Sequence, residues 1–315
     1  MVGDVIDDIV VTPLDQVTRD SDTTSRIRHT AGGSGANQAA WLGSAGVAVR
    51  FVARVAAADV ERHRIELESF GVEAMLIPDH DVPTGTIVVL LDAEGGRTMY
   101  TDRGANLRLT ASDLPLSLLD GIDVLHVNGY ALFAEGPRSA LVTLIDESRR
   151  RGIAVTVDPC SAAYLEQLGA ASFLACTRDA AVCLPNLDEG RVLAGCLEPA
   201  EVVAALREHY KVVALKLGSG GVLVSADDSG RPELIPPVAA SVIDPTGAGD
   251  AFCAGFLAGW LEGEPPSVAA RRGVALAALA VATLGGRPPD RGVVSRLSPA
   301  DRSRDRAGTR RPRRD

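Results

Sequence analysis

A glycine-containing turn that leads into an apolar helix is the feature that most restricts how this chain can fold. The turn spans residues 244–250 (DPTGAGD), and the branched residues 238–243 before it predict a strand. After the turn, Phe252, Phe256 and Trp260 recur every four residues, which predicts a helix with one apolar face. Free N–H groups and the positive dipole end at such a helix start form a site for an anion.

Asp250 lies inside this group of N–H donors, where its carboxylate would repel a phosphate. The conflict is resolved if Asp250 takes a proton from a hydroxyl group while the amides of Gly247, Ala248 and Gly249 stabilise the charge on a transferred phosphoryl group. The alternative is a helix start in which the glycines serve turn geometry alone.

Length and charge limit the class of protein. The 315 residues fit one large α/β domain, or a domain with a smaller appendage, and 46% hydrophobic residues are enough for a sizeable core. The formal net charge is −9, although the last stretch, residues 302–315, carries seven Arg against two Asp. The acidic body argues against nucleic acid as a partner, and we expect the basic end to be a solvated, disordered tail.

The cysteines and the N-terminal residues predict a cytoplasmic protein without a membrane segment. Five cysteines are present and none forms a CxxC pair, so reduced thiols are expected rather than zinc ligands or disulfides. Asp4, Asp7 and Asp8 interrupt any apolar run that could act as a signal peptide. The alanine-rich run 274–284 is far too short to span a membrane.

Alternating strands and helices predict a mostly parallel sheet with helices on both faces. The expected strands are 47–55, 72–78, 124–127, 153–157, 212–217 and 222–224, and the expected helices are 60–70, 137–151, 162–169, 200–210 and 268–284, with another from Leu187. Two further strands, 87–91 and 97–101, flank a glycine turn. Their mixed polar and apolar faces predict part of a sheet that lies over another part of the molecule. The polar stretch 15–30 suits solvent-facing strands or a mobile flap.

The first expected strand, residues 2–11, has an unusual start. Only Met1 and Val2 precede Gly3, which is little for a strand of five or six residues. Either this strand is shortened, or the natural chain begins upstream of the given Met1.

A second glycine-rich segment, residues 32–39 (GGSGANQA), ends abruptly in an alanine-rich helix. The backbone at Gly32 and Gly33 can approach a polar ligand closely, and the Asn37 amide can both donate to and accept from sugar hydroxyls. A dinucleotide fingerprint is excluded because Gln38 stands where GxGxxG needs glycine. The alternative is a loop with a structural role only.

Taken together, residues 32–39 and 244–252 resemble the two signatures of the ribokinase-like (PfkB) carbohydrate kinases. The resemblance extends to about Gly286 and implies a three-layer α/β/α core with a mostly parallel sheet and a small β-sheet lid. It implies a kinase domain over residues 1–290, with a lid formed by about 10–30 and 82–103, and leaves 291–315 as the basic tail. A P-loop kinase is excluded because GxxxxGK[ST] is absent.

The resemblance also implies roles for individual residues. Asp250 matches the catalytic base, and Gly247, Ala248 and Gly249 match the anion hole. The substrate positions implied are Asp8, Gly32, Gly33 and Asn37, with Arg103 as a lid-side contact. The positions implied for ATP are Asn186, Lys216, Gly218, Gly221 and Thr246. Glu189 matches a residue that positions Mg²⁺ through water, and Asp244 lies near a monovalent-cation position, which admits K⁺ as a further ion.

The implied activity is ATP-dependent phosphorylation of a hydroxymethyl group on a small sugar, with a pentose or ketohexose favoured. Ile6 and Cys160 replace asparagines common in relatives, which weakens the assignment of ribose. A 2-keto-3-deoxy sugar acid is an alternative because Arg97 and Arg103 lie near the lid, and a nucleoside is another, with Tyr100 as the lid aromatic. A non-catalytic sugar- or nucleotide-binding protein is the alternative from another class. Relatives often pair through their lid strands, so a homodimer is one assembly implied.

Overall fold

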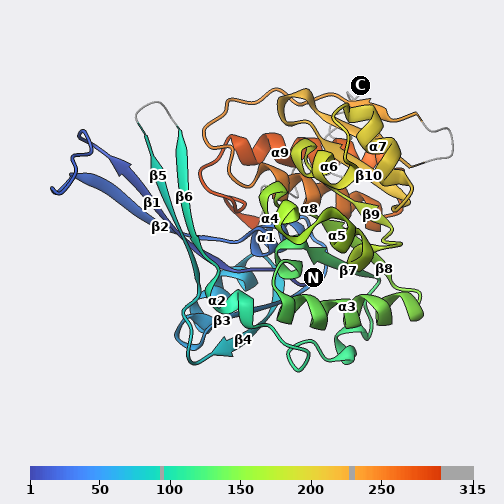
Figure 1. Cartoon of the computed structure of the whole chain (residues 1–315), viewed down its shortest axis with the longest axis horizontal. Helices are drawn as coiled ribbons and strands as arrows, with labels where there is room; N and C mark the ends of the chain where they lie inside the picture. The colour runs from blue at the N-terminus through green and yellow to red at the C-terminus, as the bar shows by residue number, and fades with distance from the viewer. Residues whose placement is uncertain (93–95, 227–230, 292–315) are drawn as a thin grey trace, which may run out of the picture.

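Two sheets organise the chain, one inside a layered core and one projecting from it. The computed structural model describes residues 1–92, 96–226 and 231–291, and the predicted tail therefore lies outside the described residues except for Arg291. Helices pack on both faces of the central sheet, while the second sheet extends away to one side (Figure 1). This is the three-layer α/β/α core with a β-sheet lid that the sequence predicts.

The central sheet is mostly parallel. Its larger part has the order β12-β11-β10-β9-β8-β7, with β7 to β10 parallel and β11 and β12 antiparallel at one edge. The strands are β7 (Val124–Asn128), β8 (Ala154–Asp158), β9 (Val182–Cys183), β10 (Val212–Lys216), β11 (Val222–Ser225) and β12 (Glu233–Ile235). The parallel pair β3 (Val49–Ala56) and β4 (Val72–Asp79) continues the sheet, because Val2 forms parallel bridges to both Val52 and Val127.

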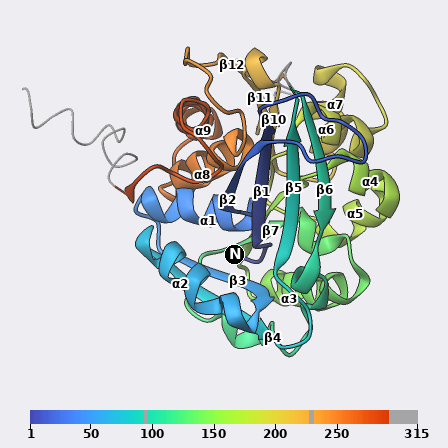
Figure 2. The same ribbon diagram turned by 90° about the vertical axis from the view of Figure 1, so that its left-hand side faces the viewer.

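Helices cover both faces of this sheet (Figure 2). Each layer of helices packs on the sheet through its own cluster of buried apolar residues. One face carries α1 (Ser34–Ser44), α2 (Val60–Ser69), α8 (Ala248–Leu261) and α9 (Pro266–Val281). The other face carries α3 (Glu135–Arg150), α4 (Ala162–Leu168), α5 (Ala170–Thr177), α6 (Leu187–Ala194) and α7 (Pro199–Arg207). Because both faces are covered, the central strands consist of continuous apolar runs. Among the described residues, no helix is long and apolar enough to cross a membrane.

The second sheet, which we call the lid, has the order β2-β1-β5-β6. Its strands are β1 (Ile6–Pro13), β2 (Ser25–Gly32), β5 (Gly85–Leu91) and β6 (Arg97–Asp102). β1 pairs in parallel with β5 and antiparallel with β2, so the two hairpins lie side by side. The predicted strand 2–11 is therefore divided: its first residues lie in the core and the rest belongs to the lid.

Three sequence-based expectations need correction. Residues 238–243 form no strand, and Val242 and Ile243 are about two-thirds exposed at 68% and 65%. The physical reason is that Pro236 and Pro237 come directly after β12 and cannot donate to a ladder. The helix after the glycine turn is α8, but it is buried all round from Ala251 to Gly259 rather than on one face, because α9 packs closely against its small residues. Helix α5 was not predicted.

Candidate active site

The carboxyl ends of the central strands meet the starts of two helices under the lid. Asn128, Asp158 and Lys216 are the last residues of β7, β8 and β10. The N-terminal turns of α1 and α8 approach the same edge, with Gly33 and Gly247 as their N-caps. Both glycines adopt positive φ, 89° and 76°, which lets the chain turn sharply into each helix. In α/β sheets, this edge is where ligands bind.

Asp250 joins the two glycine-rich segments through hydrogen bonds. Its Oδ1 accepts from Ser34 Oγ at 2.6 Å and from Gln38 Nε2 at 3.1 Å, and its Oδ2 accepts from Asn37 Nδ2 at 3.1 Å. Ser34 Oγ accepts from Asn128 Nδ2 at 2.9 Å, so its own proton is directed at Asp250. The carboxylate is thus held in one orientation by donors from α1.

Gln38 bridges the carboxylates of Asp158 and Asp250. Its Nε2 lies 2.6 Å from Asp158 Oδ2 as well as 3.1 Å from Asp250 Oδ1. The amide nitrogen therefore faces the carboxylates, and Oε1 must accept from His126 Nε2 at 2.8 Å. This fixes the His126 tautomer, because Nδ1 is left to accept from the Thr156 hydroxyl. Burial lowers the pKa of His126 to about 3, so the ring is neutral.

The surroundings raise the pKa of Asp250 to about 7. Burial is the largest cause, and the nearby Asp158 carboxylate adds to it, while the hydrogen bonds from Ser34, Asn37 and Gln38 act in the opposite direction. Lys216 Nζ lies 3.0 Å from Asp158 Oδ1 and compensates that charge. Burial lowers the pKa of Lys216 and Asp158 raises it, with the net value well above the usual one. A carboxylate with a pKa near 7 can exchange a proton at neutral pH.

Acidic groups and two arginines, Arg103 and Arg287, lie on the lid side of the site. Asp4 is buried, accepts from the Gly35 N–H at 2.8 Å and pairs with Arg103 Nη1 at 3.2 Å. The Arg103 guanidinium lies 4.3 Å above the centre of the Tyr130 ring. Asp8 on β1 lies against Gly32, where a Cβ would come within 2.1 Å of Asp8 Oδ2. Burial, followed by the Asp4 charge, raises the pKa of Asp8 to about 6 although Arg287 opposes this.

A cavity of about 590 Å³ lies between α8, α9 and the turn after β10. Its lining includes Lys216, Gly218 and Gly221 together with Ala248 and Gly249. The walls are otherwise mainly apolar, with Phe252, Val274 and Val281 among them. The cavity therefore brings three of the residues expected to bind nucleotide next to two of those expected to form the anion hole, while Asn186, Thr246 and Gly247 are not among its lining residues. The volume lies in the range of small-ligand sites.

Asp244 and Thr246 lie in the segment that leads into this helix start. Asp244 Oδ1 accepts from the Thr246 N–H at 3.0 Å, and Oδ2 accepts from the Gly285 N–H at 3.1 Å. The carboxylate therefore ties the turn before α8 to the segment after α9. Through these bonds Asp244 has a structural role, in addition to the expected place near a monovalent cation.

Asn186 and Glu189 form a reciprocal cap at the start of α6. The Glu189 N–H donates to Asn186 Oδ1, while the Asn186 N–H donates to Glu189 Oε2, both at 2.9 Å. Burial raises the pKa of Glu189 to about 7, against the opposing charge of Lys216. Within the part of the chain that the structure describes, no three His, Cys, Asp or Glu side chains converge as metal ligands. This donor set suits Mg²⁺ held mainly by water and substrate phosphates, with a single carboxylate nearby.

Sequence reasoning missed several polar residues of the site: Asp4, Ser34, Gln38, His126, Tyr130 and Asp158. One signal was available, since Gln38 and His126 are polar residues within segments that otherwise read as buried. Tyr130 and Asp4 carried no such signal. The side chain of Arg97 lies outside the described residues.

Comparison with known proteins agrees with this geometry. A family model described as pfkB family carbohydrate kinase matches residues 1–291. The chain belongs to this family. A fructokinase of Klebsiella pneumoniae is 30% identical over 79% of this chain and 83% of that protein. A 2-dehydro-3-deoxygluconokinase of Thermoproteus tenax is 29% identical over 82% of this chain and 81% of that protein.

A solved structure gives the same picture for the fold. Arabidopsis thaliana ribokinase complexed with ribose and ATP matches 94% of this chain and 96% of its own, with a TM-score of 0.77 and 25% identity. The pfkB chain is therefore a ribokinase-like, ATP-dependent sugar kinase.

The bridging role of Gln38 can be measured directly on Asp250. Gln38→Leu removes one hydrogen bond to the ionised carboxylate, worth roughly 1.5–3 kcal/mol, so we expect the pKa of Asp250 to rise from about 7 by roughly one to two units. ¹³C NMR titration of the Asp250 carboxyl would measure this. Thr156→Val is the matched control, since it breaks only the far end of the network, beyond His126. An unchanged titration in Gln38→Leu would contradict the bridge.

Proposed function

We propose that this kinase transfers the γ-phosphoryl group of ATP to a hydroxymethyl group of a small neutral sugar, a pentose or a ketohexose, with Asp250 as the general base. The observation that carries this proposal is the position of Asp250. It is fixed by three donors from α1, its pKa is raised to about 7, and it lies at the helix start beside the cavity that contains Lys216 and Gly218.

The chemistry follows from that position. Asp250 Oδ accepts the proton of the sugar hydroxyl, whose oxygen then attacks the γ-phosphorus as the bond to ADP breaks. The N–H groups of the first turn of α8, at Gly247, Ala248 and Gly249, have no partners within the helix and stabilise the negative charge on the transferring group. Asp250, now protonated, returns the proton to solvent after the sugar phosphate leaves.

Lys216, Gly218, Gly221 and Thr246 are proposed to bind ATP, with Asn186 close to its phosphates. Mg²⁺ would neutralise charge on those phosphates when bound. Each oxygen of Glu189 accepts one hydrogen bond from Asn186 and retains a lone pair, so it can still hold a water molecule of the metal. A monovalent cation near Asp244, K⁺ in particular, and a cytoplasmic location are further parts of this proposal.

The charge on the substrate side supports a neutral sugar. Asp4, Asp8 and Asp250 all face this region, and the charge of Arg103 is already balanced by Asp4. A carboxylate or phosphate on the substrate would add repulsion, and both nearby guanidinium groups are already paired, Arg103 with Asp4 and Arg287 with Glu66. Hydroxyl groups, in contrast, can donate to the carboxylates and to Asn37 Oδ1, which has no hydrogen-bond partner among the described residues. Gly32 and Gly33 are proposed to contact such a ligand through their backbone, since the space on their Cβ side is filled by Asp8 and by residues 4–6.

Three alternatives have weaker support. A 2-keto-3-deoxy sugar acid would use Arg103, in line with the relative from Thermoproteus tenax. A nucleoside would need a free aromatic face, but the Tyr130 ring is covered by Arg103, and Tyr100 is 60% exposed on β6. A non-catalytic binding protein would have no use for a carboxylate tuned near pH 7.

Exposed apolar residues on the lid support the expectation of a homodimer. Ile27 on β2 and Met99 and Tyr100 on β6 are 57%, 60% and 60% exposed. By the strand register Ile27 and Tyr100 lie on one face of the lid, and pairing of two lids through that face would cover them, whereas Met99 lies on the opposite face. Sedimentation velocity would test this, and a monomer at all concentrations would contradict it.

The role of Asp250 predicts the effect of removing its charge. Asp250→Asn keeps the size of the side chain but cannot accept a proton, so we expect kcat to fall by about 100-fold or more while ATP binding is largely retained. Steady-state kinetics and calorimetric titration with ATP would measure the two effects. Turnover within tenfold of the parent would show that Asp250 is not the base.

The charge of the site predicts the order of substrates. In an ADP-release assay over pentoses, ketohexoses, 2-keto-3-deoxy sugar acids and nucleosides, we expect a neutral pentose or ketohexose to have a kcat/KM at least about tenfold above any sugar acid. Arg103→Gln is the matched variant: it should lower kcat/KM selectively for acids only if the acid alternative is correct. A sugar acid or nucleoside used best would contradict the neutral-sugar proposal, and binding without turnover would favour a sensor.

A further inference from the structure

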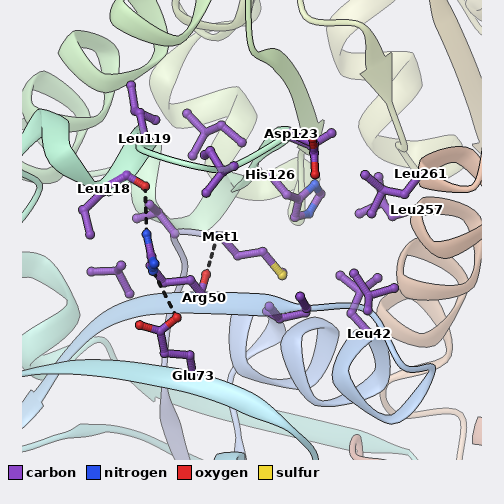
Figure 3. Close-up of a pocket in the computed structure, with 18 of the residues that line it drawn as sticks. Met1, Leu42, Arg50, Glu73, Leu118, Leu119, Asp123, His126, Leu257 and Leu261 are labelled. Atoms are coloured by element: carbon purple, nitrogen blue, oxygen red, sulfur yellow. Dashed lines mark hydrogen bonds and ion pairs between the residues drawn. The ribbon is translucent and has the colours of Figure 1, made fainter.

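Two polar regions of the molecule lie outside the set of residues that the kinase proposal uses. The first is a cavity of about 590 Å³ between β3 and β7 (Figure 3). There the Arg50 side chain pairs with Glu73 at 3.2 Å, the Met1 nitrogen donates to Arg50 O at 2.6 Å, and both ring nitrogens of His126 are hydrogen-bonded, so these groups are not free to bind a ligand. The second is the guanidinium of Arg287, which is buried although its Nε has no hydrogen-bond partner among the described residues.

Arg287 is held at the edge of the proposed sugar site by the backbone that precedes it. Gly286 O accepts from Trp41 Nε1 at 2.9 Å, and a Cβ on Gly286 would overlap the Asn37 amide. Trp41 and Asn37 belong to α1, and Asn37 also donates to Asp250. The segment after α9 is therefore packed against the helix that holds the proposed base, and Arg287 extends from a fixed point beside it.

The guanidinium of Arg287 and the carboxylate of Asp8 both lie against Gly32. Arg287 Nη2 donates to Gly32 O at 3.4 Å, and a Cβ on Gly32 would overlap the Asp8 carboxylate. Arg287 is 8% exposed and Asp8 is half-buried, so water screens their charges only weakly. Arg287 Nη1 also lies 2.8 Å from Glu66 Oε1 on α2. The charge of Arg287 thus acts on two carboxylates, directly on Glu66 and through space on Asp8.

Asp8 depends on this charge because the other charged groups that face it are acidic. Burial is the largest cause of its raised pKa, about 6, and the carboxylates of Asp4 and Asp7 add to it. Arg287 opposes the rise. The basic side chains next to those two acidic neighbours are Arg103 at Asp4, and Arg62 and His63 at Asp7.

The ionised form of Asp8 is the one that suits a sugar. A carboxylate accepts hydrogen bonds on both oxygens, so neighbouring hydroxyl groups of one sugar can donate to it together, whereas a protonated carboxyl group gives up part of this capacity. With a pKa of about 6, Asp8 is mostly ionised at neutral pH and loses its charge progressively as the pH falls below that. Sugar binding through Asp8 is therefore sensitive to any charge that acts on it.

We propose that Arg287 is a positioning residue of the sugar site, which acts across Gly32 to keep Asp8 in its acceptor form, and that Glu66 competes with Asp8 for the charge of Arg287. This inference rests on the proposed function, because it takes Asp8 as the group that binds sugar hydroxyls. Removing Arg287 and removing Glu66 should therefore affect Asp8 in opposite directions.

Three variants of the full chain test this balance, with ¹³C NMR titration of the Asp8 carboxyl as the readout. Arg287→Gln removes the positive charge, so we expect the pKa of Asp8 to rise from about 6 by about one unit. Glu66→Gln frees Arg287 from its competing carboxylate, so we expect a fall of about half a unit. Glu61→Gln is the matched control, because it removes a charge from the same helix but from an ion pair with Arg64, and it should leave Asp8 unchanged.

The pH dependence of KM links this charge balance to the sugar. At about pH 6, a rise of one unit lowers the ionised fraction of Asp8 about fivefold, so Arg287→Gln should raise KM for the sugar by about the same factor. At about pH 8.5 Asp8 is ionised in both proteins, and their KM values should agree. We expect kcat at saturating sugar to stay within about twofold of the parent at each pH, because Asp250 keeps its donors from α1.

An Asp8 titration that is the same in the parent, Arg287→Gln and Glu66→Gln would overturn the proposal. If Arg287→Gln did not fold, the comparison of Glu66→Gln with Glu61→Gln would still decide it. A KM that rises equally at both pH values would give Arg287 a structural role only, which also overturns the proposal. A failure of the kinase proposal is distinguishable, because it would appear as absent turnover in a protein whose Asp8 titrations still behave as expected.

Discussion

A carboxylate shared between two helices is the interaction on which the site depends. Asp250 lies in the first turn of α8, and its carboxylate accepts hydrogen bonds from Ser34, Asn37 and Gln38 of α1. The two glycine-rich segments, which are far apart in the sequence, therefore meet at this carboxylate. Burying this charge beside Asp158 is costly, and the cost appears as a raised pKa. The raised pKa is useful for the proposed chemistry, because a carboxylate with a pKa near 7 can take up and release a proton at neutral pH.

The hydrogen bonds that compensate the charge of Asp158 continue this network into the core. Asp158 is bonded to Lys216 on one oxygen and to Gln38 on the other, while Gln38 is held from behind by neutral His126. The network reaches from the end of β10 to the centre of β7. It lies at the carboxyl ends of the strands, so the parallel sheet that supports the core also fixes the site.

The sequence predicted the central strands and most helices because their apolar runs and alternation are local properties. It was wrong for residues 238–243, since branched residues favour a strand only where a neighbouring edge is available, and Pro236 and Pro237 end that edge. It predicted the residues of the two glycine signatures but not Asp4 or Tyr130, which come together only in the folded chain, where both contact Arg103.

The sequence by itself therefore determined the fold class, the family and the two segments that converge on Asp250, because glycine turns, apolar periodicity and signature spacing are written along the chain. Only the tertiary structure decided the partners and proton affinity of Asp250, because these depend on burial and on the charges of Asp158 and Lys216, brought close by separate strands. It also decided how residues 1–3 pair, since a strand between β3 and β7 is defined by two neighbours that are distant in sequence.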